Sequence, residues 1–177
     1  NYTDGDSYRL NNWMGVFRSK ELAANYTAEF AQMFEQRKFG PAKARRTPYP
    51  TLAVAGTRLS NCFSPPGDCA DLIVDTIKRE AQRSIRFMAF SFTHDGIGRA
   101  IAAKAQAGVK VLGVFETTGS NTPFSEYGQM KQAGLEVYTD GNPYSMHHKV
   151  IILDDHVAIA GSFNFSNNAD QDNDENL

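Results

Sequence analysis

Apolar and polar positions in the second part of the chain alternate in blocks that predict strands and helices in turn. Apolar runs of strand length occupy 84–92, 109–115 and 135–138, and stretches of helical period at 95–107 and 122–134 separate them. Strands separated by helices of this length predict an α/β fold. We expect a mixed β-sheet flanked by helices on both faces.

Two further apolar runs follow, at 150–153 and 157–160, and a short polar turn joins them. Both are rich in β-branched or small apolar residues and predict two adjacent strands. Side chains two positions apart in a strand share a face. His147 and Lys149 are therefore predicted to point the same way, whereas His148 points the opposite way.

The first part of the chain carries one clear helical pattern, which begins after a possible N-cap at Ser19 and ends before Gly40 and Pro41. Large apolar residues recur along it at helical spacing, at Leu22, Tyr26, Phe30, Met33 and Phe34. Such a stripe is typical of a helix face that packs on a core, and we expect these residues to be buried.

Length and composition allow a well-packed domain but give no strong charge signal. The chain has 177 residues, 41% of them hydrophobic, and a formal net charge of −2, so no global basic field favours nucleic acid. A basic cluster at 37–46 and an acidic stretch at 170–175 are interpreted as solvated surface. No apolar run approaches membrane-spanning length, and no signal peptide is visible.

Six residues separate the two cysteines, Cys62 and Cys69. A disulfide between them suits a secreted or cell-envelope protein, which is slightly favoured. Two free buried thiols are the alternative, and the sequence leaves both open.

Polar residues at the ends of the two C-terminal strands form the chemical pattern of the chain, H-x-K-x4-D-x6-G-S-x-N. Its members are His147, Lys149, Asp154, Gly161, Ser162 and Asn164. An imidazole can attack phosphorus or protonate a leaving oxygen near neutral pH, and an ammonium neutralises phosphoryl oxygens. A hydroxyl and an amide donate further hydrogen bonds. With the lysine as the cation, this set needs no metal and no cofactor.

The pattern resembles the HxKxxxxDxxxxxxGSxN motif of the phospholipase D superfamily over all eighteen positions. The resemblance implies an α-β-α sandwich and metal-independent hydrolysis of phosphodiesters through a phosphohistidine. It implies that His147, Lys149 and Asp154 form the catalytic group, in which Asp154 gives support through hydrogen bonds without touching substrate. By analogy His147 is the general acid, and it is the nucleophile if the usual order of the two histidines is reversed here.

The same resemblance assigns roles to the residues around this group. Ser162 and Asn164 complete a phosphate cradle with Gly161 in support, and Glu175 matches an acid that fixes the tautomer of a catalytic histidine.

An internal repeat of long period is a further prediction. Residues 1–12 and 164–175 both begin with Asn, an aromatic residue and a hydroxyl residue, and both continue with Asp and Asn. Asn1 would then bind substrate as the end of an earlier motif, although chance similarity of two polar loops is the alternative. Where the second copy has Glu175, the first has Asn12.

The repeat predicts three segments: 1–40 as the end of a first phospholipase D-like repeat, 41–50 as a linker, and 51–177 as a second, C-terminally truncated domain that carries the motif. The predicted function is a phospholipase D-type phosphodiesterase. A nuclease is the close alternative, and a non-catalytic phosphate-binding module is the alternative from another class. The expected partner is a phospholipid or nucleic acid substrate, with the first motif upstream or in a second copy of a homodimer.

Overall fold

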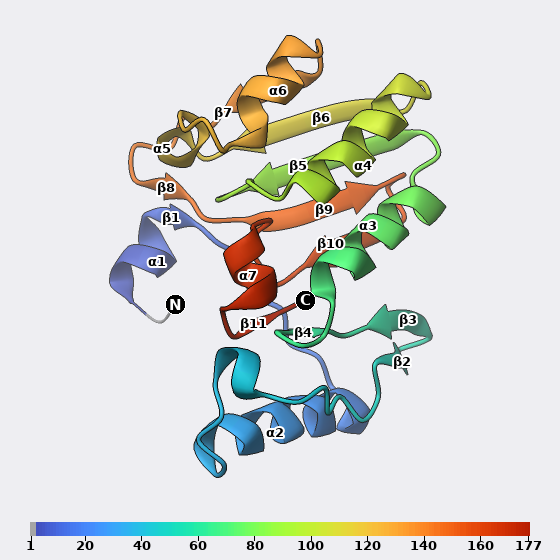
Figure 1. Ribbon diagram of the computed structural model, residues 1–177, viewed down its shortest axis with the longest axis vertical. Helices are drawn as coiled ribbons and strands as arrows, with labels where there is room; N and C mark the ends of the chain where they lie inside the picture. The colour runs from blue at the N-terminus through green and yellow to red at the C-terminus, as the bar shows by residue number, and fades with distance from the viewer. Residues whose placement is uncertain (1–2) are drawn as a thin grey trace. The chain divides into compact units, whose positions relative to one another are not determined.

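The computed structural model describes residues 3–177, which divide into two compact units (Figure 1). The first unit holds the residues up to Trp13 together with Ala70–Ser166, and the second holds Met14–Cys69 and Asn167–Leu177. These units are divided differently from the predicted segments. The predicted internal repeat of residues 1–12 and 164–175 is not tested by this division and stays a prediction.

A five-stranded mixed sheet forms the centre of the first unit. Its strands are β5 (Ser84–Ala89), β6 (Lys110–Phe115), β7 (Glu136–Thr139), β9 (Lys149–Leu153) and β10 (Val157–Ala160). The order is β10-β9-β5-β6-β7; β5, β6 and β7 run parallel, and β9 and β10 pair antiparallel. The predicted mixed α/β class is confirmed.

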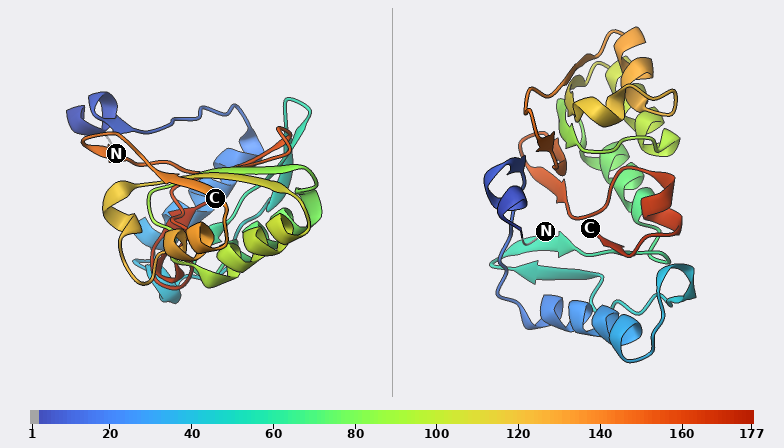
Figure 2. Two further views of the ribbon diagram at one scale, coloured as in Figure 1. Left: turned by 90° about the horizontal axis from the view of Figure 1, so that it is seen from above. Right: turned by 90° about the vertical axis from the view of Figure 1, so that its left-hand side faces the viewer.

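Helices of this unit cover one face of the sheet (Figures 1 and 2). They are α3 (Cys69–Glu80), α4 (Asp95–Gln106), α5 (Thr117–Ser120) and α6 (Glu126–Gln132). Along β5, Ile85 and Phe87 are buried, whereas Arg86 is exposed and Met88 half-exposed. These four helices therefore cover the face of the sheet that carries Ile85 and Phe87.

Local signals explain where the helices begin and end. His94 caps α4, because its Nδ1 accepts a hydrogen bond from the Ile97 N–H at the start of the helix. Gly108 follows α4 with φ +90°, a conformation that glycine adopts without steric cost. The start of α6 was predicted wrongly at Thr122, because Ser125 provides the side-chain cap instead.

A short N-terminal piece, α1 (Asp4–Tyr8) followed by β1 (Leu10–Asn11), also belongs to the first unit. β1 pairs in parallel with β8 (Ser145–Met146), which immediately precedes the motif. The sequence predicted only a loop here, because a two-residue strand has no periodicity and exists through its distant partner.

The second unit combines one long helix with two small strand pairs. Its elements are α2 (Lys20–Phe34), the 3-10 helix η1 (Gly40–Ala42), β2 (Thr51–Val54), β3 (Thr57–Ser60), β4 (Phe63–Ser64), α7 (Asn167–Gln171) and β11 (Glu175–Asn176). β2 and β3 form an antiparallel hairpin, and β4 pairs antiparallel with β11.

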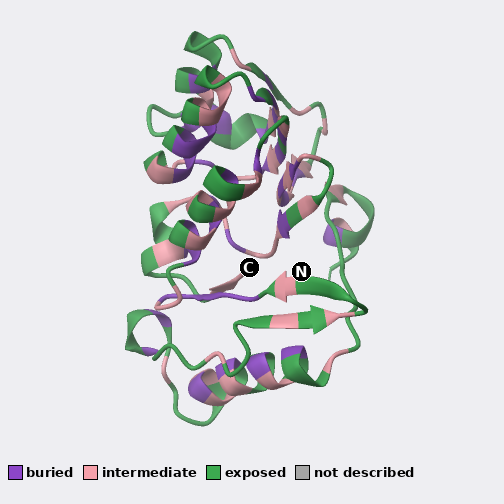
Figure 3. Ribbon diagram, turned by 90° about the vertical axis from the view of Figure 1, so that its right-hand side faces the viewer, coloured by how far each residue is buried: buried purple, intermediate pink, exposed green. Residues whose placement is uncertain are grey.

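The burial predicted for α2 was wrong, although its N-cap at Ser19 is confirmed. Leu22 is buried, but Tyr26, Phe30 and Phe34 are 44%, 54% and 72% exposed. Figure 3 shows buried, intermediate and exposed positions alternating along this unit's long helix. The buried face instead carries polar residues, Asn25, Glu29 and Gln32. They are buried because they hydrogen-bond segment 43–61: Asn25 bonds the backbone of Tyr49 and the side chain of Asn61, and Gln32 accepts from the Ala44 N–H.

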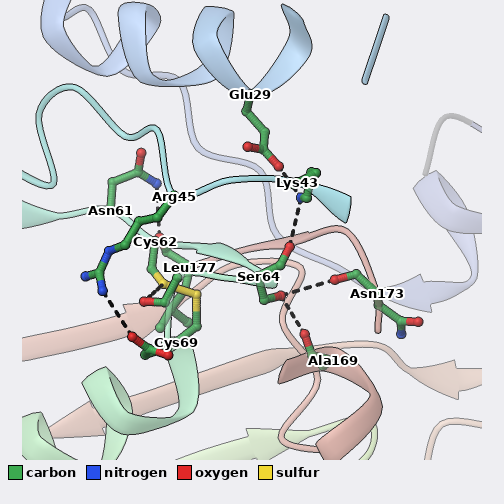
Figure 4. The surroundings of a disulfide bond; sticks show 12 residues. Glu29, Lys43, Arg45, Asn61, Cys62, Ser64, Cys69, Ala169, Asn173 and Leu177 are labelled. Atoms are coloured by element: carbon green, nitrogen blue, oxygen red, sulfur yellow. Dashed lines mark hydrogen bonds and ion pairs between the residues drawn. A yellow bond between two sulfur atoms is a disulfide. The ribbon is translucent and has the colours of Figure 1, made fainter. Parts of the chain in front are cut away.

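A buried lysine and a disulfide fasten this unit (Figure 4). The fully buried ammonium of Lys43 pairs with Glu29, lies 2.8 Å from Asp174 Oδ1, and donates to the Ser64 carbonyl at 2.9 Å. Lys43 was predicted to be a solvated linker residue, which is wrong because these three acceptors surround it. Cys62 and Cys69 form a disulfide, which decides between the two alternatives of the sequence.

Candidate active site

The motif histidine lies in the two-residue connection between β8 and β9. Its backbone N–H donates to the Asn11 carbonyl at 3.0 Å, which continues the β1–β8 pairing by one residue. The His148 carbonyl accepts from the Phe90 N–H at 2.8 Å, just after β5. The backbone on both sides of the His147 side chain is therefore held by neighbouring strands.

Phe90 brings the motif histidine and lysine together. The His147 ring packs edge-on against the Phe90 ring with centroids 4.5 Å apart, and Lys149 Nζ lies 4.7 Å from the centroid of the same ring. Lys149 Nζ also donates to the His147 carbonyl at 3.1 Å. The prediction that the two side chains share a side is confirmed. No pattern in the sequence marked Phe90, which is one aromatic residue among many.

Asn12 is a second residue that the sequence did not assign to the site. Its Oδ1 lies 3.0 Å from His147 Nδ1. The comparison of residues 1–12 with 164–175 had marked this position, since Asn12 stands where the other copy has Glu175. That departure was the available signal.

Burial is the largest influence on the pKa of His147 and lowers it below the ordinary histidine value. The ammonium of Lys149 lowers the pKa further, because it repels an imidazolium, and the Asp6 carboxylate opposes both effects. The balance favours a neutral imidazole at neutral pH.

The second half of the motif follows β10. Phe163 and Phe165 are fully buried, so they anchor the backbone on either side of Asn164. The Phe165 N–H donates to the Ser91 carbonyl, and its own carbonyl accepts from the His94 N–H at 2.9 Å. Both halves of the motif are thus held by the segment that follows β5.

Within residues 3–177, Asn164 Oδ1 is buried and makes no hydrogen bond. Buried amides are normally paired, and Oδ1 only accepts, so this atom suits a ligand group that donates a hydrogen bond. Gly161 and Ser162 precede it and are half-buried.

Asp154 stands apart from the histidine and lysine. It follows β9 at the end opposite Lys149, about 16 Å away along a strand that rises 3.3 Å per residue. Its carboxylate accepts from the backbone N–H groups of Gln82, Arg83 and Ser84 at 2.8–3.0 Å. These bonds hold its pKa below the ordinary value. Asp154 thus supports the start of β5 through hydrogen bonds, and its assignment to the catalytic group stays a prediction.

Two further site residues were predicted, Asn1 and Glu175. Asn1 lies outside the described residues. Glu175 lies in β11 of the second unit, where its backbone pairs with Ser64, and its support of a catalytic histidine stays a prediction. Among residues 3–177, no group of three or more His, Cys, Asp or Glu side chains could hold a metal ion. In the same residues no helix is both long and apolar enough to span a bilayer.

Comparison with known proteins agrees with the motif. A family profile described as "Cardiolipin synthase, PLD-like domain" matches residues 73–177, more than half of the chain. "Phospholipase D" of Rickettsia prowazekii (strain Madrid E) is 32% identical over 151 residues, 85% of this chain and 73% of the relative. "Mitochondrial cardiolipin hydrolase" of Homo sapiens is 34% identical over 116 residues, 66% of this chain and 46% of the relative.

A solved structure shows the same architecture. The phospholipase D family member Nuc from Salmonella typhimurium superimposes with a TM-score of 0.61 at 35% identity, over 66% of this chain and 78% of that one. Fold, motif and relatives together define a hydrolase of the phosphodiesterase class. Within that class, the chain belongs to the phospholipase D superfamily.

Proposed function

We propose that this chain hydrolyses the phosphodiester bond of phospholipids through a covalent phosphohistidine. The observation that carries the proposal is that the His147 ring and the Lys149 ammonium both contact the Phe90 ring. Burial lowers the pKa of His147, which favours the uncharged imidazole. An uncharged imidazole has a lone pair for phosphorus or for a water proton, and the ammonium beside it can neutralise the non-bridging oxygens.

The proposed reaction has two steps. First, an imidazole nitrogen forms a bond to phosphorus while the bond from phosphorus to the leaving oxygen breaks, and that oxygen takes a proton from a second imidazole. Second, a water oxygen attacks the phosphohistidine, the P–N bond breaks, and the second imidazole accepts the water proton. Lys149, Ser162 and Asn164 would bind the phosphoryl oxygens throughout. The second imidazole would come from another copy of the motif, upstream in the same protein or in a homodimer.

Relatives support the choice of phospholipid. The two proteins named above are called phospholipase D and cardiolipin hydrolase, and both names refer to phospholipid substrates. The net charge of −2 gives no broad attraction to a polyanion, so nucleic acid is the second candidate. A phosphate-binding module without turnover is the third.

The test is a pair of release assays in the presence of chelator: headgroup release from vesicles of phosphatidylcholine and cardiolipin, and nicking of supercoiled plasmid. We expect lipid cleavage that His147→Asn lowers at least about 100-fold, since it removes the acid–base and nucleophilic group. His156→Asn, in the exposed turn after β9, is the matched control and should retain activity.

Three outcomes separate the candidates. Plasmid nicking without lipid cleavage would assign the nucleic acid substrate. Saturable lipid binding that survives His147→Asn, with no product from either variant, would assign a binding module. Activity abolished by chelator and restored by a metal ion would contradict the role given to Lys149.

A further inference from the structure

The amide of Asn12 has a fixed orientation. Its Nδ2 donates to the Asp6 carbonyl at 3.0 Å, and its Oδ1 faces His147 Nδ1 at 3.0 Å. Rotating the amide by 180° would place its oxygen opposite the Asp6 carbonyl oxygen. Both atoms are acceptors, so no hydrogen bond could form between them. Because Oδ1 only accepts, the ring nitrogen that faces it must carry a proton. His147 is therefore held as the Nδ1–H tautomer.

Neighbouring backbone contacts place Asn12 where it can do this. β1 pairs with β8 through Leu10 and Asn11, and the His147 N–H donates to the Asn11 carbonyl. Asn142 fastens the same strand, since its Nδ2 lies within hydrogen-bonding distance of both the Arg9 carbonyl and Asn11 Oδ1. Asn12, which follows β1, is therefore placed beside the side chain of His147, which follows β8.

We infer that Asn12 is a positioning residue, which holds His147 with its proton on Nδ1 so that Nε2 presents its lone pair to phosphorus and His147 acts as the nucleophile. The assignment of the chemical step rests on the proposed function, whereas the contact and the tautomer do not. In that step Nε2 forms the bond to phosphorus, the leaving oxygen departs with the P–O electron pair, and it takes its proton from a second imidazolium. The positive charge that develops on the His147 ring is met by the dipole of the Asn12 amide.

The charged groups around His147 agree with this role. From β9, Lys149 disfavours an imidazolium, and the neighbouring His148 does so weakly; from α1, Asp6 favours it. Asn12 adds no charge. With burial as the largest influence, the pKa of His147 is lowered, and an uncharged ring with its Nε2 lone pair free fits the nucleophile. This reverses the order taken from family analogy, in which His147 was the acid.

Two-bond proton–nitrogen NMR spectra of the ¹⁵N-labelled chain test the contact without any substrate, because they distinguish a protonated from an unprotonated ring nitrogen. We expect the Nδ1–H tautomer of His147 in the native chain and loss of that preference in Asn12→Ala. A carboxylate at this distance favours imidazolium, so Asn12→Asp should raise the pKa of His147 by roughly one unit or more.

Asn11→Asp is the matched control. It introduces a carboxylate one residue away and keeps an oxygen for Asn142 Nδ2 to bind, but it is the side chain of Asn12, not that of residue 11, that contacts the His147 ring. It should shift the pKa of His147 by less than about half a unit. An Nε2–H tautomer in the native chain, or equal shifts in both aspartate variants, would overturn the assignment of Asn12.

A trapping experiment tests the role of the histidine. The chain is mixed with bis(p-nitrophenyl) phosphate, quenched in alkaline denaturant, and examined by peptide mass spectrometry. A phosphoryl adduct on His147 supports the nucleophile assignment, and turnover with the adduct on another residue refutes it. Absence of turnover would count against the proposed function, while the tautomer and the pKa shift would still decide the role of Asn12.

Discussion

Replacing Lys43 by methionine should strongly destabilise the second unit. The substitution keeps the length of the side chain but removes the ammonium that pairs with Glu29 and Asp174 and donates to the Ser64 carbonyl. Removing one partner of a buried ion pair costs about 3–5 kcal/mol, because the opposite charge is left without compensation. The Asp174 side chain is 28% exposed and can be hydrated, whereas that of Glu29 is only 11% exposed, so we expect about 3 kcal/mol.

Urea unfolding followed by circular dichroism measures this cost, and for a chain of this size about 3 kcal/mol corresponds to a melting temperature roughly 6–12 °C lower. Adding Glu29→Gln should recover part of the loss, because it removes the uncompensated charge. Lys78→Met, at an exposed position on α3, is the control and should change stability by less than about 0.5 kcal/mol. A loss below about 1 kcal/mol for Lys43→Met, or no recovery in the double variant, would refute the argument.

Three further predictions address packing, pH and the disulfide. Gly113→Ala should lower the free energy of unfolding by about 1–3 kcal/mol, because a Cβ there would lie 2.1 Å from the buried Phe87 ring. Gly128→Ala, which has open space around it, should instead stabilise α6 by about 0.5–1 kcal/mol. Chemical denaturation measures both changes. The pKa of His147 is lower in the folded chain than in the unfolded chain, so the unfolded chain binds the proton more readily as the pH falls. The free energy of unfolding should therefore decrease between about pH 7 and 5. In His147→Gln this decrease should be less steep. Cys62→Ser should cost about 2.5 kcal/mol, from the chain entropy of a loop this short, and reducing agent should lower the native chain to the same stability.

Regular patterns predicted the motif-bearing sheet well. The strand runs were assigned from local periodicity, and the shared side of His147 and Lys149 followed from strand parity alone. These features depend on residues close in sequence.

Features that depend on distant partners could not be predicted. The exposed stripe of α2 looked like a core face, and only the partners of Asn25 and Glu29, many residues away in sequence, explain why the polar face is buried instead. Asp154 belongs to the motif by spacing, yet its hydrogen-bond partners begin at Gln82. Likewise the contact of Asn12 with His147 spans 135 positions, and no periodicity connects them.

The position of Trp13 gives this site an optical property of its own. Trp13 is the sole tryptophan of the chain, it follows Asn12 directly, and its side chain is 43% exposed. Indole emission depends on how much water surrounds the ring. Any change that separates the N-terminal strand from the imidazole, or closes it over a bound phosphate, therefore alters the fluorescence of one defined residue, and occupancy of the site can be followed in solution without an attached dye.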